Sequence, residues 1–135
     1  MRYLSADEVV AVHFYVMREL WNEPLYGLRD RALLESAVNR PVSTALYTDS
    51  DVFDQAAKLL EGLIANHPFL QGNKRTAYAA TELFLLLNGW RCDAEDQQLI
   101  SLCLGIAMGS VGAEAAGRFL RDNSVPWSQA EECEQ

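Results

Sequence analysis

The sequence predicts an all-α fold, a bundle of helices that carries one short irregular or hairpin flap. Apolar residues recur every three or four positions through most of the chain, which is the period of one helical face. The 135 residues are 50% hydrophobic and 22% charged, the balance of an ordinary globular domain. No repeat, linker or low-complexity block divides them. We therefore expect one domain over residues 1–123, followed by a flexible acidic tail over residues 124–135.

The first expected helix follows a capping box, in which Ser5 caps the helix and Glu8 reaches back to the Ser5 backbone. Its apolar face runs to Leu20. Pro24 is expected to end it, because proline disfavours the helical conformation in the preceding residue. His13 lies on the apolar face, where a lone histidine is usually packed and hydrogen-bonded rather than functional.

The flap is expected between the second and third helices. The second helix is predicted over residues 29–39 and should stop ahead of Pro41. Residues 42–52 then combine β-branched side chains with a turn-like stretch at 48–51. This pattern is typical of a loop or a short hairpin, and local signals leave both open.

The remaining helices are predicted over residues 54–66, 76–88, 96–108 and 113–121. The segment 76–88 is apolar almost all round, so we expect it to be the central helix, buried on most sides. Gly89 supplies its C-terminal stop.

The composition indicates in which cell compartment the protein acts and which classes of partner it can bind. The net charge of −8 argues against direct binding of nucleic acid, which requires a basic face. No signal peptide is apparent, and the least polar stretch, 99–113, is too short for a membrane span and contains three glycines. Cys92, Cys103 and Cys133 are odd in number and widely spaced, which is typical of reduced thiols. These features favour a cytoplasmic protein that does not bind membranes.

The residues that carry chemistry lie in one string, 67–75, between two apolar helices. A helix N-terminus presents unpaired backbone N–H groups and a positive dipole end, which together bind anions. Gly72 lets a backbone approach a ligand closely, and Asn73 can orient one through its amide. Lys74 and Arg75 add two cations where phosphate oxygens would lie.

His67 opens the string, where a neutral imidazole can take the proton of an attacking hydroxyl. Phe69 is expected to enter the core and anchor the loop. Phosphoryl or nucleotidyl transfer needs a base at one side and fixed positive groups at the other. Neither a Walker loop nor a Gly-x-Gly-x-x-Gly motif is present.

The string, His67-Pro68-Phe69-Leu70-Gln71-Gly72-Asn73-Lys74-Arg75, resembles the Fic/Doc signature His-x-Phe-x-(Asp/Glu)-Gly-Asn-(Gly/Lys)-Arg. It is most similar to the Doc ("death on curing") toxin branch, and the resemblance covers nearly all of residues 3–123. It implies a Fic fold in which His67, Lys74 and Arg75 are catalytic and residues 72–75 bind the nucleotide phosphates. Doc toxins phosphorylate a threonine of elongation factor Tu and are restrained by an antitoxin whose C-terminal segment folds into a groove on the toxin.

The resemblance thus implies a toxin kinase that moves phosphate from a nucleoside triphosphate, with ATP expected, to a Ser or Thr hydroxyl of a translation factor. Fic proteins that transfer AMP carry a second glycine and a second arginine where this chain has Lys74 and Tyr78. These two residues favour phosphate transfer and leave nucleotidyl transfer as the alternative. The self-inhibitory (Ser/Thr)-x-x-x-Glu-(Gly/Asn) motif is absent, so a separate antitoxin is expected to provide the restraint.

One position departs from the signature. Gln71 stands where the resemblance implies an acidic magnesium ligand, and magnesium prefers carboxylate oxygens. Three explanations stay open: the nucleotide phosphates hold most of the metal, the enzyme is slow, or the chain is a catalytically weakened Fic fold that acts as a binding module.

Overall fold

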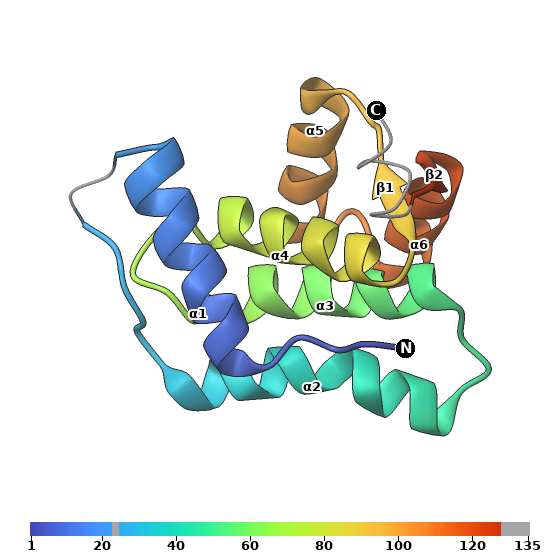
Figure 1. The fold of residues 1–135 in the computed structure, drawn as a ribbon, viewed down its shortest axis with the longest axis horizontal. Coiled ribbons are helices and arrows are strands. Elements are labelled where there is room, and N and C mark those ends of the chain that lie inside the picture. The colour runs from blue at the N-terminus through green and yellow to red at the C-terminus, as the bar shows by residue number, and fades with distance from the viewer. Residues whose placement is uncertain (23–24, 128–135) are drawn as a thin grey trace.

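The computed structural model describes residues 1–22 and 25–127. In this part of the chain six α-helices, one π-helical segment and two short strands form the fold (Figure 1), which confirms the all-α class. In chain order the elements are α1 (Ala6–Phe14), η1 (Tyr15–Leu20), α2 (Arg31–Tyr47), α3 (Val52–Asn66), α4 (Asn73–Leu87), β1 (Trp90–Cys92), α5 (Asp96–Ala107), α6 (Ala113–Asp122) and β2 (Ser124–Pro126).

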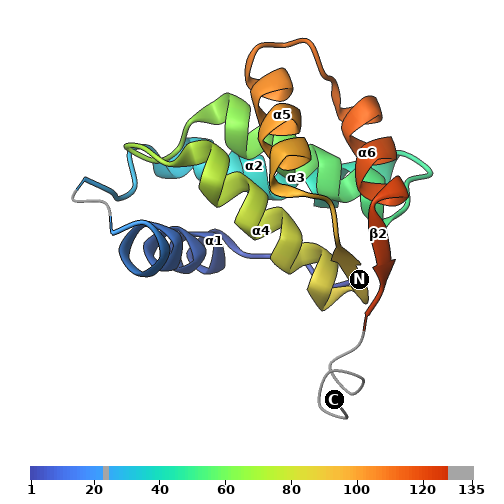
Figure 2. The ribbon, with the colours of Figure 1, turned by 90° about the horizontal axis from the view of Figure 1, so that it is seen from above.

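Helix α3 lies at the centre, with α2 and α4 on either side and α6 packed against it (Figures 1 and 2). Its small residues allow this close packing: a Cβ atom on Gly62 would lie 2.8 Å from the Cδ of Arg40. The prediction that residues 76–88 form the central helix is therefore wrong. One face of α4 stays open, because Ala79, Leu83 and Leu86 line a surface groove beside α1.

Helix α2 runs through Pro41 to Tyr47, so the expected stop before Pro41 and the loop or hairpin flap expected over residues 42–52 are both wrong. A proline inside a helix removes one backbone hydrogen bond and costs about 3 kcal/mol. The long contact between α2 and α3 offsets this cost, since Leu34, Ala37 and Pro41 itself are buried along it. Tertiary packing here overrides a strong local signal.

The N-terminal helix begins at the predicted capping box: the Ser5 hydroxyl accepts from the Glu8 N–H (3.1 Å), and the Glu8 carboxylate accepts from the Ser5 N–H (2.9 Å). After α1 the chain continues as the π-helix η1, which ends where the Trp21 N–H donates to the Val16 carbonyl (3.1 Å). Single π-helical turns are rare and occur frequently at functional sites. The expected stop at Pro24 lies outside the described residues.

The C-terminal end departs from the expected boundary. Residues 124–126 form β2, which pairs antiparallel with β1 so that Val125 lies opposite Arg91. The folded domain therefore extends past residue 123, because three backbone positions that look like tail in the sequence are paired with a distant strand. Residues 128–135 of the acidic tail, with Cys133, lie outside the described residues, whereas Cys92 and Cys103 are buried free thiols. Across residues 1–22 and 25–127 no helix has the length and apolar character needed to cross a bilayer.

Candidate active site

The string 67–75 joins the end of α3 to the first turn of α4, and two of its residues, His67 and Gly72, are left-handed. His67 ends α3 with φ 48° and ψ 55°, and Gly72 begins α4 with φ 75° and ψ 22°. A non-glycine residue in this conformation costs about 1–2 kcal/mol. Such strain persists only where surrounding contacts enforce it. The contacts around His67 therefore bear on its role.

Arg29 holds the backbone of His67 in this conformation. Its Nε donates to the His67 carbonyl (2.8 Å), its Nη2 donates to the Asn66 carbonyl (3.1 Å), and its backbone N–H donates to the Pro68 carbonyl (2.7 Å). A cation is also favoured at this negative end of the α3 dipole. Sequence reasoning assigned no role to Arg29, because its side-chain partners lie 37 and 38 positions away and no local pattern marks them.

An extended segment, residues 27–30, covers the loop in place of the flap expected over 42–52. Leu28 and Phe69 form an antiparallel bridge, and the Leu70 N–H donates to the Gly27 carbonyl (2.9 Å). Phe69 is buried, with 2% of its surface exposed. Its side chain therefore holds the middle of the loop in the core while its backbone pairs with the segment 27–30.

Asn73 closes the loop on itself. Its Nδ2 donates to the Phe69 carbonyl (3.0 Å) and its Oδ1 accepts from the Phe69 N–H (2.9 Å). The amide that sequence reasoning assigned to a ligand is thus bonded at both ends to the loop backbone. Asn73 shapes the site from within.

Gly72 is required by its conformation and by its surroundings. Its φ of 75° disfavours any side chain, and a Cβ atom would lie 2.3 Å from the sulfur of Met17, which is fully buried. Met17 belongs to η1, so the π-helix packs directly against the start of α4. Glycine here allows the N-terminal helix and the loop to approach each other.

Helix α4 begins at Asn73, three residues before the predicted start, so Lys74 and Arg75 lie in its first turn. Among the described residues no side chain caps this turn. Lys74 is exposed, and the Arg75 guanidinium lies 4.5 Å from the ring centroid of Trp21. The N-terminal N–H groups of a helix, the positive dipole end and two cations thus share one turn, the arrangement that binds phosphate. Sequence reasoning missed Trp21, which the π-helix brings to Arg75.

The His67 side chain is exposed, and its Nδ1 lies 3.4 Å from the Ala65 carbonyl. In the tautomer that donates from Nδ1 to this carbonyl, Nε2 keeps its lone pair. That nitrogen is then the atom that can accept a proton from a hydroxyl.

The described residues of the loop do not by themselves build a magnesium site. The Gln71 side-chain nitrogen donates to the Leu25 carbonyl, which leaves one neutral amide oxygen on this side chain. No group of three His, Cys, Asp or Glu residues that could hold a metal occurs in the described parts of the chain. Magnesium requires several oxygens in an octahedron and favours carboxylates among them.

His13 was predicted to be packed and hydrogen-bonded, and the structure confirms this. The residue is fully buried, its Nδ1 lies 2.9 Å from Thr76 Oγ1, and its Nε2 accepts from the Gly27 N–H (3.0 Å). Burial lowers the pKa of His13 to about 4.

This pKa predicts a loss of stability in mild acid. The unfolded chain binds a proton at His13 near pH 6.5, whereas the folded chain does so only near pH 4, so the free energy of unfolding falls as the pH drops through this window. The fall in the free energy of unfolding should approach about 3 kcal/mol, which corresponds to the full difference between the two pKa values of His13. Denaturant unfolding of the wild type and of His13→Gln between pH 7.5 and 4.5 measures it. Parallel curves for the two proteins would contradict it.

Comparison with known proteins was consistent with this geometry. Residues 3–85, which include the whole 67–75 string, match the Fic/DOC family. "Toxin Doc" from Mycolicibacterium smegmatis is 44% identical over 70 residues, which are 50% of this chain and 54% of that protein. "Protein kinase doc" from Escherichia phage P1 is 29% identical over 122 residues, or 90% of this chain and 94% of that protein. The match thus spans about half of the first relative and nearly all of the second. The chain belongs to the Fic/DOC family.

Proposed function

We propose that this protein is a Doc-type toxin that transfers the γ-phosphate of a nucleoside triphosphate, with ATP as the expected donor, to a Ser or Thr hydroxyl of a translation factor resembling elongation factor Tu. One observation carries the proposal: a single loop, anchored in the core by Phe69, places the left-handed His67 at one end and the cationic first turn of α4 at the other. The names of the two relatives, a toxin and a protein kinase, support it.

The chemistry follows from this arrangement. His67 Nε2 accepts the hydroxyl proton as the hydroxyl oxygen attacks the γ-phosphorus. The bond from that phosphorus to the bridging oxygen breaks, and the nucleoside diphosphate leaves with the electron pair. The first turn of α4, with Lys74 and Arg75, stabilises the charge on the transferring group.

Mass spectrometry of the target tests the proposal. The purified protein is incubated with ATP and an elongation factor Tu-like protein, once with label on the γ-phosphate and once with label on the α-phosphate. We expect a phosphate adduct on a Ser or Thr and label only from the γ position. A nucleoside monophosphate adduct carrying the α label would overturn phosphate transfer in favour of nucleotidyl transfer.

The structure offers little support for this nucleotidyl alternative. Tyr78 stands where AMP-transferring relatives have a second arginine, and its hydroxyl donates to the Glu82 carboxylate (2.8 Å), one turn further along α4. Burial and this hydrogen bond raise the pKa of the Tyr78 hydroxyl far above its ordinary value. The side chain is therefore a neutral phenol bonded away from the loop, so it does not supply the missing cation.

The binding-module alternative rests on Gln71, and Gln71→Asp tests it. A carboxylate at this position should lower the magnesium concentration for half-maximal transfer by roughly tenfold, since even outer-shell partners of metal ligands change affinity 10–100-fold. Without magnesium, the added negative charge should weaken ATP binding. Magnesium titrations of transfer and of ATP binding measure both effects.

Gln71→Ala is the matched control, because it also loses the hydrogen bond to the Leu25 carbonyl but adds no charge. Equal magnesium dependence in Gln71→Asp and Gln71→Ala would show that position 71 does not contact the metal. If none of the proteins transfers phosphate although all fold and bind ATP, the binding-module reading is favoured.

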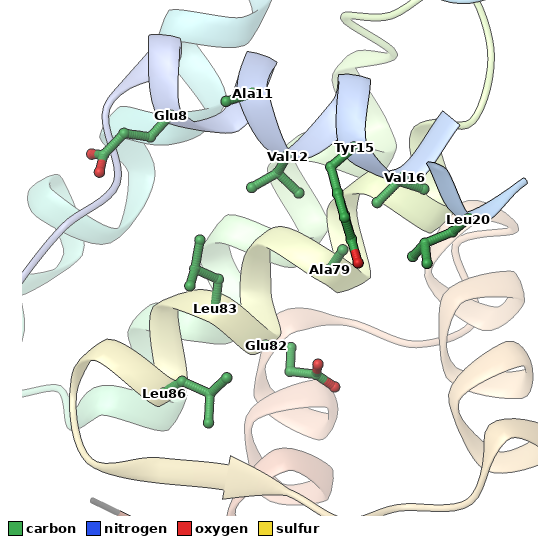
Figure 3. Close-up of a pocket in the computed structure, with 10 residues that line it drawn as sticks. All are labelled: Glu8, Ala11, Val12, Tyr15, Val16, Leu20, Ala79, Glu82, Leu83 and Leu86. Atoms are coloured by element: carbon green, nitrogen blue, oxygen red, sulfur yellow. The ribbon is translucent and has the colours of Figure 1, made fainter. Parts of the chain in front are cut away.

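The antitoxin, in this proposal, binds the groove between the N-terminal helix and α4 (Figure 3). The groove has a volume of about 530 Å³. Its lining is mostly apolar, with Glu8, Tyr15 and Glu82 among the apolar side chains Ala11, Val12, Val16, Leu20, Ala79, Leu83 and Leu86. An exposed apolar groove of this kind suits the nonpolar face of an amphipathic helix, such as the C-terminal segment of an antitoxin.

Leu83→Arg should reduce the affinity for a peptide of that antitoxin segment by about tenfold or more, because a charge would replace an apolar side chain that lines the groove. Leu87→Arg is the matched control, since Leu87 is on the same helix, is 36% exposed and does not line the groove. Calorimetric titration with the synthetic peptide measures both affinities. An equal loss in the two variants would place the antitoxin elsewhere.

A further inference from the structure

His13 contacts three separate parts of the active site from its buried position on α1. Its Nε2 accepts from the backbone N–H of Gly27, in the segment that covers the loop (3.0 Å). Its Nδ1 lies 2.9 Å from the hydroxyl of Thr76, which follows Arg75 in α4. Its ring stacks on Phe69, with ring centroids 3.9 Å apart and an angle of 9° between the planes.

The hydrogen-bond directions assign one protonation state. A backbone N–H can only donate, so Nε2 must carry a lone pair, and the ring proton is then on Nδ1 and donates to Thr76 Oγ1. Among the described residues, the hydrogen-bond and ring contacts of His13 are with Gly27, Thr76, Phe69, Tyr26 and Phe14, and none of these five is charged. Protonated His13 would direct a second N–H at the Gly27 donor.

These contacts connect the base, the phosphate-binding turn and the segment 27–30, whose relative positions must be correct for phosphoryl transfer. Phe69 lies two residues after the base His67, and Thr76 lies one residue after the phosphate-binding Arg75. Gly27 belongs to the segment whose Arg29 holds the His67 backbone. A small displacement between a base and a bound phosphate costs rate steeply: about 1 Å can cost 10²-fold.

We propose that His13 is a positioning residue for phosphoryl transfer, which sets the place of His67 relative to the first turn of α4 through Gly27, Phe69 and Thr76. This inference rests on the proposed function. His13 is buried and touches no substrate. It should therefore affect the rate of transfer more than the binding of ATP, because the phosphate-binding turn keeps its own backbone and cations.

His13→Phe keeps a stacked ring but removes both hydrogen bonds. We expect its kcat to fall by at least about tenfold while its Kd for ATP changes by less than about threefold. His13→Gln, whose carbonyl oxygen can accept from Gly27, should recover part of the rate. Thr76→Val, which keeps a β-branched side chain without the hydroxyl, should lower kcat in the same direction and serves as the test if His13→Phe does not fold.

Val9→Ala is the matched control, because Val9 is also fully buried on α1 and lies one turn before His13. At temperatures where every variant is folded, its kcat should stay within about twofold of the wild type. A kcat for His13→Phe equal to that of Val9→Ala, or equal falls in kcat and ATP affinity, would overturn the positioning role.

A second readout does not depend on activity. The amides of Gly27 and Leu70 should exchange with solvent at least about tenfold faster in His13→Phe than in Val9→Ala, because the segment 27–30 loses its tie to α1. If the wild type transfers no phosphate, the proposed function fails, and this exchange experiment alone decides whether His13 holds the loop. Equal exchange rates in the two variants would overturn the inference.

Discussion

Replacing His67 with alanine should reduce phosphoryl transfer by about 10²–10⁴-fold, which is the usual contribution of a general base. The side chain is exposed and its one described hydrogen bond is long, so its loss should change the free energy of unfolding little. ATP binding should persist, because the anion-binding turn belongs to α4. Initial rates with the phosphorylated target as readout, together with calorimetric titration of ATP, separate these effects.

His67→Asn is the matched variant for this experiment. Asparagine adopts the left-handed conformation more readily than alanine, so it should keep the loop geometry while removing the base. Both variants should be equally inactive if His67 acts through its imidazole. Activity in His67→Asn comparable to the wild type would assign His67 a backbone role only, and full toxicity of either variant would remove the base assignment altogether.

Arg75→Ala should reduce transfer by about 10²–10³-fold and should also weaken ATP binding. The guanidinium N–H groups are expected to donate to phosphate oxygens both in the ground state and in the transition state. The guanidinium carbon lies 4.5 Å from the ring centroid of Trp21, a cation–π contact that helps to position the group. Arg75→Lys keeps the charge but loses the fork, so it should recover only part of the affinity. Lys74→Ala should have a milder effect, since its exposed ammonium is flexible.

Calorimetry with ATP and initial-rate kinetics measure these changes. Trp21→Ala is the control for the stacking: it should lower transfer less than Arg75→Ala and leave the charge in place. Unchanged ATP affinity and unchanged rate in Arg75→Ala would show that this guanidinium does not bind the nucleotide.

Much of the fold follows from local patterns. The capping box at Ser5 and the starts of α5 and α6 lie where the sequence predicts them, because each depends on residues only a few positions apart. The predicted end of the second helix before Pro41 is wrong. Its continuation depends on burial against α3, which no window around the proline contains. The sheet of β1 and β2 was missed for the same reason, since each strand is short and its partner is distant.

The candidate site likewise has a part that the sequence predicts and a part that depends on contacts between distant residues. The sequence by itself predicts which nine residues carry the chemistry and that they connect two helices, because His67, Gly72, Lys74 and Arg75 lie within nine consecutive positions and their residue types are those of a base and an anion site. Only the tertiary structure decided what holds them: Arg29 on the His67 carbonyl, His13 between Gly27 and Thr76, and Trp21 against Arg75. These contacts join residues up to 63 positions apart. Their geometry depends on how helices pack around α3, and short-range periodicity and capping signals carry no information about it.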